Sequence, residues 1–122
     1  MSTNTRHIRA LLDAQRRLLA EHRDLPVTVA ATLLGVAVWE DHVDSAGERM
    51  SLEDLAARIG TAPSSLSQHM RYLGERYRFE KPGLGFVQTY EHPSSGRKKT
   101  FHLTPRGRGL IRQLDLILRK AD

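Results

Sequence analysis

The 122-residue sequence contains no cysteine, only one tryptophan, and no long uninterrupted apolar run. Without cysteine the chain forms no disulfide, offers no thiolate to zinc and cannot sense oxidation through a thiol. Its longest apolar stretch, residues 27–39, is broken by Thr28, Thr32 and Gly35 and is too short to cross a bilayer. The first residues lack the apolar core of a signal peptide. We therefore expect a cytoplasmic protein with no membrane contact.

The sequence also lacks recognisable catalytic chemistry. Its six histidines are scattered and form no relay with a serine and an acid, and no glycine-rich phosphate loop is present. His42, Asp44 and Glu48 are chemically suited to a divalent metal, but their spacing crosses a polar loop, so a solvent-exposed loop is the favoured interpretation. We expect a protein that is not an enzyme and that has no cofactor and no metal.

Positive charge is concentrated in the second half of the chain. The formal net charge is +5, yet residues 1–62 carry seven Lys or Arg against nine Asp or Glu, whereas residues 63–122 carry twelve against five. A basic surface of this kind favours a polyanionic partner. With 39% hydrophobic residues, a chain of this length suits one domain with its own core.

Hydrophobic periodicity predicts two helices in the first 42 residues. The first extends from residue 5 to about 22, with apolar positions every three or four residues. The second begins at Pro26, continues to about 41 and is so apolar that we expect it to be buried on most sides. Trp39 near its end either packs in a core or dimer contact, which we favour, or lines a small-molecule pocket.

Two shorter helices follow a polar loop. Ser51 and Asp54 predict a capping box for the first, which ends at Gly60. The second opens at Pro63, and its apolar stripe of Leu66, Met70 and Leu73 leaves a polar outer face. This pair is typical of a helix-turn-helix, in which the second helix enters the major groove. The outer positions are Ser64, Ser65, Gln68, Arg71 and Tyr72, and the residues that we assign to DNA contact are Ser64, Ser65, Ser67, Gln68 and Arg71.

A basic hairpin is predicted after the second short helix. Residues 76–84 are expected to extend that helix or to form an irregular connection, with Arg76 and Lys81 available to phosphates. Strands at 86–91 and 100–103 then flank a turn, which leaves Arg97, Lys98 and Lys99 at its tip. The alternative is that this cluster is an ordinary solvated turn, but its position in a hairpin that follows a helix-turn-helix favours DNA contact.

The last helix is expected from Pro105 to about Arg119, with Thr104 as its N-cap. Its apolar residues and those of the first helix either complete the core of one chain or, as we favour, form a two-fold symmetric dimer interface.

Residues 51–110 resemble MarR-type transcriptional regulators. Arg97, Phe101, Leu103, Thr104 and Gly107 match that family's wing signature, and residues 55–60 and 63–68 resemble its helix-turn-helix. The resemblance implies a winged helix, a homodimer held by the first and last helices, a recognition helix in each major groove and Arg97 in the adjacent minor groove. Ser95 stands where the signature has an aspartate, so the carboxylate that would orient Arg97 is missing.

We predict a mainly α protein with a small β-hairpin wing, in one domain over residues 1–122. Residues 1–42 and 105–120 supply core and dimerisation helices, and residues 51–104 form the DNA-binding head. The predicted function is sequence-specific regulation of transcription on double-stranded DNA by a homodimer. A small-molecule effector has no support in the sequence. The alternatives are a sequence-independent DNA-coating, replication or segregation protein and a winged-helix protein-interaction module.

Overall fold

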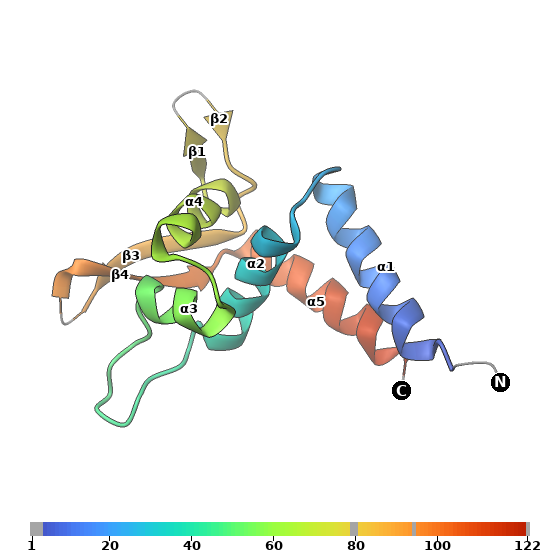
Figure 1. Ribbon diagram of the computed structural model, residues 1–122, viewed down its shortest axis with the longest axis horizontal. Coiled ribbons are helices and arrows are strands. Elements are labelled where there is room, and N and C mark those ends of the chain that lie inside the picture. The colour runs from blue at the N-terminus through green and yellow to red at the C-terminus, as the bar shows by residue number, and fades with distance from the viewer. Residues whose placement is uncertain (1–3, 79–80, 94, 122) are drawn as a thin grey trace.

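Helices and short hairpins alternate in the computed structural model, which describes residues 4–78, 81–93 and 95–121, and only the backbone of residues 76–78 and 95–97 (Figure 1). The helices are α1 (Arg6–Glu21), α2 (Val27–Trp39), α3 (Leu52–Ile59), α4 (Pro63–Leu73) and α5 (Pro105–Arg119). The strands are β1 (Arg76–Arg78), β2 (Lys81–Pro82), β3 (Val87–His92) and β4 (Ser95–Leu103). The predicted class, mainly α with a small β wing, is confirmed.

A single core holds α2, α3, α4 and the β3–β4 hairpin together. Leu33 and Val36 of α2, Leu55 of α3, Leu66 of α4 and Phe101 of β4 are all at most 1% exposed. Each of these elements therefore presents one apolar face to a common centre, and the polar faces of α4 and of the hairpin remain outside. We call this unit the head.

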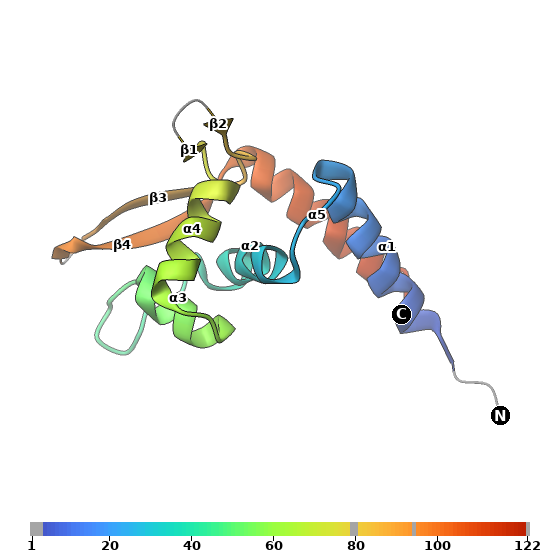
Figure 2. The same ribbon diagram turned by 45° about the horizontal axis from the view of Figure 1, so that its top comes forward.

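The α1 and α5 helices lie side by side, on the opposite side of α2 from the β3–β4 hairpin (Figures 1 and 2). Their contact buries Leu18 of α1 and Leu110 and Leu114 of α5. At the margin, Glu21 accepts a hydrogen bond from Arg106 at 3.5 Å. Within the described part of the chain, none of the helices combines the length and the apolar character that a membrane span requires.

The α2 helix is buried or half-buried at nine of its 13 positions, as its apolar sequence predicts, but one stripe of it is exposed. Val27, Leu34 and Val38 are 80%, 43% and 69% exposed, because α2 packs against the other elements of the head and against α5 but leaves this stripe open. Trp39 is half-buried against the core, and the guanidinium carbon of Arg58 lies 5.9 Å from the centre of its ring. Packing is thus the observed role of this tryptophan.

The segment after α4 does not extend the helix, and instead of a wholly irregular connection it contains two short strands, β1 and β2. The helix ends at Leu73, and β1 pairs with β2 in a small antiparallel hairpin that projects in a different direction from the β3–β4 hairpin (Figure 1). The returning chain hydrogen-bonds to the end of α4, since the Leu84 and Phe86 N–H groups donate to the carbonyls of Tyr72 and Leu73 at 2.9 and 2.7 Å. At Gly83 a Cβ would lie 2.1 Å from the Gly74 carbonyl oxygen, so only glycine fits there.

The second hairpin, which we call the wing, is longer than predicted. β3 and β4 pair from Val87–Leu103 out to His92–Ser95, with a register shift next to Glu91. The basic cluster belongs to β4, close to the end of the hairpin where it was predicted. Lys99 pairs with Glu91, and Arg97 and Lys98 lie in the register irregularity between that pair and the His92–Ser95 pair. Thr104 caps α5 as predicted, its side chain accepting from the Gly107 N–H at 3.0 Å.

Candidate nucleic-acid interface

The predicted helix-turn-helix is present between α3 and α4. The Asp54 N–H donates to the Ser51 hydroxyl at 3.2 Å and the Ser51 N–H donates to the Asp54 carboxylate at 3.1 Å, which is the expected capping box. Gly60 ends α3 in the left-handed region with φ of +90°, so the chain turns sharply into α4. The turn fixes the angle between the two helices.

The outer face of α4 carries most of the polar side chains assigned to DNA contact. Ser64, Gln68 and Arg71 are exposed, and Ser65 and Ser67 are half-buried at the edges of that face. Small hydroxyls at the start of a helix allow close approach to a groove. Glutamine can bind adenine with two hydrogen bonds, and arginine can bind guanine or a phosphate.

A groove separates α4 from the wing. One part, of about 310 Å³, is lined by Ser64, Ser67, Lys98 and Lys99, among others. The adjoining part, of about 380 Å³, shares Ser67 and Lys99 and adds Arg71. The fold thus brings together polar side chains of the helix and lysines of β4 that lie about 30 residues away in the sequence.

Of the eight predicted site residues whose side chains the structure describes, three do not line this groove. Ser65 and Gln68 lie on α4 outside its lining, and Lys81 is exposed on β2. The side chains of Arg76 and Arg97 are outside the described part of the structure, which places only their backbones in β1 and β4.

Sequence reasoning missed several residues of the groove lining, among them two polar residues of the wing and two carboxylates. Gln88 and Thr89 of β3 line the groove from the wing side, and Glu53 and Glu75 place carboxylates at its walls. An alternating pattern in β3 indicates which side chains share a face, but it does not indicate that this face meets α4. The two carboxylates disfavour phosphate in their immediate surroundings, which restricts how a backbone can lie in the groove.

One side of α4 faces α2 and α1 instead of solvent. Tyr72, predicted on the outer face, is half-buried, and its ring meets that of His22 edge to face with centroids 5.5 Å apart. This prediction was wrong because Tyr72 lies two turns after Ser65, on the edge of α4 that packs against the rest of the head.

His69 on the same side forms a polar contact with α2. The Thr32 hydroxyl donates to the Thr28 carbonyl at 2.9 Å, so its oxygen is available to accept from the His69 Nδ1–H at 3.2 Å. Burial lowers the pKa of His69 below its usual value of 6.5, because the charged ring is less well solvated between the helices. A neutral ring in the Nδ1–H tautomer fits this contact.

The loop that precedes α3 hydrogen-bonds to both strands of the wing. The Thr100 hydroxyl donates to the Met50 carbonyl at 2.9 Å, and the ring Nε2 of His92 lies 2.8 Å from the Arg49 carbonyl oxygen. The Arg49 guanidinium carbon also lies 5.7 Å from the centre of the Tyr90 ring. Both strands of the wing are therefore held to the start of α3, which fixes the lysines of β4 relative to α4.

A buried carboxylate lies where the wing meets α5. Glu40, directly after α2, is 7% exposed, and its Oε1 accepts from the Leu103 N–H at 3.0 Å. Arg108 donates to both carboxylate oxygens at 2.8 Å. Nothing in the local sequence indicates this pair, because its members are 68 residues apart.

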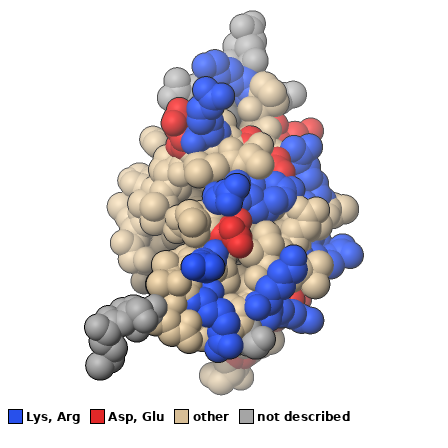
Figure 3. Space-filling model, turned by 90° about the vertical axis from the view of Figure 1, so that its right-hand side faces the viewer, with Lys and Arg blue, Asp and Glu red and all other residues tan. Residues whose placement is uncertain are grey.

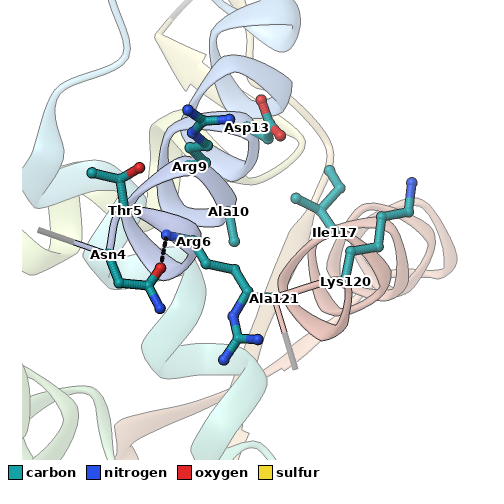
Figure 4. A pocket seen from close by; sticks show the side chains of 9 residues that line it. All are labelled: Asn4, Thr5, Arg6, Arg9, Ala10, Asp13, Ile117, Lys120 and Ala121. Carbon is teal, nitrogen blue, oxygen red and sulfur yellow. Dashed lines mark hydrogen bonds between the residues drawn. The ribbon is translucent and has the colours of Figure 1, made fainter. Parts of the chain in front are cut away.

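Hollows away from the groove include two that involve the terminal helices. An apolar hollow of about 260 Å³ is bordered by α1, α2 and α5, with Leu11, Leu19, Leu34 and Leu118 in its lining. A hollow of about 360 Å³ lies where α1 begins and α5 ends, with the cations Arg6, Arg9 and Lys120 around Ala10 and Ile117 (Figure 4). The described residues contain no group of three or more His, Asp or Glu side chains that could hold a metal.

These elements define a winged helix-turn-helix fold, with the helix-turn-helix of α3 and α4, a basic wing beside it and a separate pair of terminal helices. Solved structures carry the same fold. A point mutant of MepR from S. aureus, bound to an oligodeoxyribonucleotide, superposes with a TM-score of 0.65 at 18% identity, over 92% of this chain and 70% of that one.

Two further solved structures also superpose on this chain. MarR has a TM-score of 0.58 at 18% identity, over 92% of this chain and 72% of that one. MosR of M. tuberculosis, in complex with DNA, has a TM-score of 0.56 at 23% identity, over 93% and 70%. No protein-family model and no curated protein sequence matches the chain. The fold is that of MarR-type winged-helix regulators, so the resemblance seen in residues 51–110 is confirmed at the level of structure.

Proposed function

We propose that this protein is a sequence-specific, double-stranded-DNA-binding regulator of transcription that acts as a homodimer in the cytoplasm. The observation that carries the proposal is the groove in which the outer face of α4 meets the lysines of β4. Such a groove combines hydrogen-bonding side chains for base edges with fixed positive charge for the phosphates beside them. The DNA complexes of MepR and MosR, which share the fold, support the same interpretation.

Within this proposal the site residues divide by chemistry. Ser64, Ser65, Ser67, Gln68 and Arg71 read or flank bases in the major groove. Lys98 and Lys99 neutralise phosphates, and Arg97 enters the adjacent minor groove. Arg76 and Lys81 belong to the β1–β2 hairpin at the end of α4, where they would extend the backbone contact beyond the recognition helix.

A second copy of the chain is the proposed occupant of the apolar face, by which we mean the exposed residues Leu11, Leu19, Leu34 and Leu118 around the apolar hollow. These four leucines are 43–49% exposed and come from three different helices. Contiguous exposed apolar residues are typical of association surfaces. Figure 3 looks onto the α1–α5 end, where a broad area without charged residues borders clusters of Lys and Arg.

Two-fold symmetry makes the same face serve both partners. Because the wing and the terminal helices lie on opposite sides of α2, pairing through α1 and α5 leaves both grooves open to DNA (Figure 1). The operator would then consist of two inverted half-sites about one helical turn apart, roughly 34–36 Å between centres.

The test is selection from a random duplex pool at two salt concentrations, with the mass of the protein in solution determined in parallel. A two-fold symmetric motif bound by a dimer supports the proposal. Salt-sensitive binding without a motif would assign a DNA-coating role, and no binding at moderate salt would assign a protein-interaction module.

A further inference from the structure

The junction between the wing and α5 is fixed on two sides. On one side Thr104, between β4 and α5, donates its N–H to the Phe86 carbonyl at 3.0 Å and its hydroxyl to the Gly85 carbonyl at 2.6 Å. On the other side Glu40 binds the last N–H of β4 and the guanidinium of Arg108, in the first turn of α5. The first contact ties α5 to the wing, and the second ties it to α2.

The pair of Glu40 and Arg108 is a directional contact. The two parallel N–H···O bonds of a guanidinium with a carboxylate fix the relative orientation of both groups as well as their distance. The Glu40 side chain is 8% exposed and that of Arg108 is 47% exposed, so the carboxylate depends on its protein partners while the cation also reaches water. Arg49 donates to the main-chain carbonyl of Glu40 and anchors the residue itself.

The junction is also the point at which a small rotation has a large effect. The 15 residues of α5 span about 22 Å at a rise of about 1.5 Å each. A rotation of about 10° at the first turn therefore moves the far end of α5 by about 4 Å, close to the rise of one base pair, about 3.4 Å. Leu110 and Leu114 of α5 belong to the same buried cluster as the head, so a rotation of α5 shifts its own contacts with that cluster while the contacts among α2, α3, α4 and the wing can stay as they are.

We propose that Glu40 and Arg108 are positioning residues that set the spacing between the two half-sites. They do so by fixing the direction in which α5, and with it the dimer contact, leaves the head. The inference rests on the proposed function, since spacing has a meaning only for a dimer on paired half-sites. It adds a specificity determinant that does not touch the DNA.

The experiment uses full-length protein and the half-site selected by the wild type. Duplexes carry either one half-site or two inverted half-sites whose centre-to-centre separation varies in single base-pair steps. Dissociation constants are measured for the wild type, Glu40→Gln, Arg108→Gln and the control Asp115→Asn, with circular dichroism to confirm folding. Asp115 pairs within α5, with Arg119 at 2.9 Å, so its variant removes a carboxylate without touching the junction.

We expect Glu40→Gln and Arg108→Gln to reduce the affinity ratio between the best separation and one that differs by two base pairs, by about threefold or more. Affinity for a single half-site should stay within about twofold of wild type, because the head remains intact. Asp115→Asn should keep the wild-type ratio. Glutamine at position 40 can still accept from Leu103, so this variant removes the charge and not the main-chain contact.

Two results would overturn the inference. One is a wild-type spacing ratio in both junction variants. The other is a loss of single-half-site affinity in proportion to the loss for paired sites, which would mean that the pair stabilises the whole head. Failure of the proposed function looks different, because the wild type itself would then select no paired half-sites.

Discussion

Replacing Leu118 with glutamine tests whether the apolar face joins two copies of this chain. Leu118 lies on α5 in the lining of the apolar hollow and is 45% exposed, so its contribution to the core of the single chain is limited. The polar amide should therefore leave the chain folded while it weakens association. A fall in dimer stability without a comparable fall in the melting temperature of the chain is the expected pattern.

The magnitude follows from the exposed fraction. Full burial of a leucine side chain contributes about 1.5–3 kcal/mol, so covering the exposed 45% of Leu118 contributes about 1 kcal/mol. Each substitution occurs twice in a two-fold dimer, which doubles the loss to about 2 kcal/mol, or roughly a 30-fold weaker dimerisation constant. Burying the amide without a partner increases the loss further.

Sedimentation over a concentration series measures the dimerisation constant directly. Val43→Gln is the matched control, because Val43 is 51% exposed but lies in the loop before α3, away from α1 and α5. The control should dimerise like the wild type. Equal dimerisation of Leu118→Gln and wild type would refute the assignment of this face to a second copy.

Three further predictions concern the head. Lys99→Ala should weaken binding to all duplexes alike and lower the slope of log affinity against log salt by about 0.9, whereas Lys120→Ala, at the far end of α5, should leave the slope unchanged. Gln68→Ala should relax preference at one base pair, with a loss of discrimination of about 1–3 kcal/mol measured on single-position variants of the selected site; an unaltered preference would contradict base reading by this residue. The pKa of His69 is lowered in the folded state, so its contribution to stability is complete above about pH 6.5 and is lost as the pH falls through the lower folded value. Thermal unfolding from about pH 7.5 to 5 should therefore depend less on pH in His69→Gln than in the wild type, while the exposed-residue control His42→Gln keeps the wild-type dependence; parallel curves for all three proteins would contradict this assignment.

Local chemistry explains the parts of the fold that the sequence predicts. Two helix caps, the capping box of Ser51 and Asp54 and the cap at Thr104, each join residues only three positions apart. They can therefore be predicted from the sequence alone. The inner stripe of α4 follows from helical periodicity alone. These signals place both the helix-turn-helix and the start of α5 correctly.

Long-range packing explains what could not be predicted. The exposure of Leu34 was missed because an apolar residue gives the same local signal whether it belongs in a core or on a surface that binds another chain. The β1–β2 hairpin depends on the approach of Gly83 to the end of α4, and glycine there reads only as a helix breaker. The contact between Glu40 and Arg108 joins residues with no local relation.

The candidate site divides in the same way. The outer face of α4 was predicted from periodicity, and in the structure Ser64, Ser67 and Arg71 line a two-part groove together with Lys98 and Lys99. The contribution of β3 to that groove was not predictable, because it depends on the angle between the wing and α4. The hydrogen bonds from the loop before α3 to the wing set that angle, and no sequence pattern predicts these bonds.

The closure at Gly83 has a consequence for how this protein can vary. The main-chain hydrogen bonds between residues 72–75 and 83–86 bring the chain back to its starting point before the wing begins. The strands β1 and β2 are therefore anchored where the chain leaves α4 and where it returns, so a change in the length of this hairpin need not move α4 or the wing. The entropic cost of closing a loop rises only slowly as the loop becomes longer. This hairpin is accordingly a place where the reach of the proposed backbone contact, through Arg76 and Lys81, can change while the packing of α4 and the wing is kept.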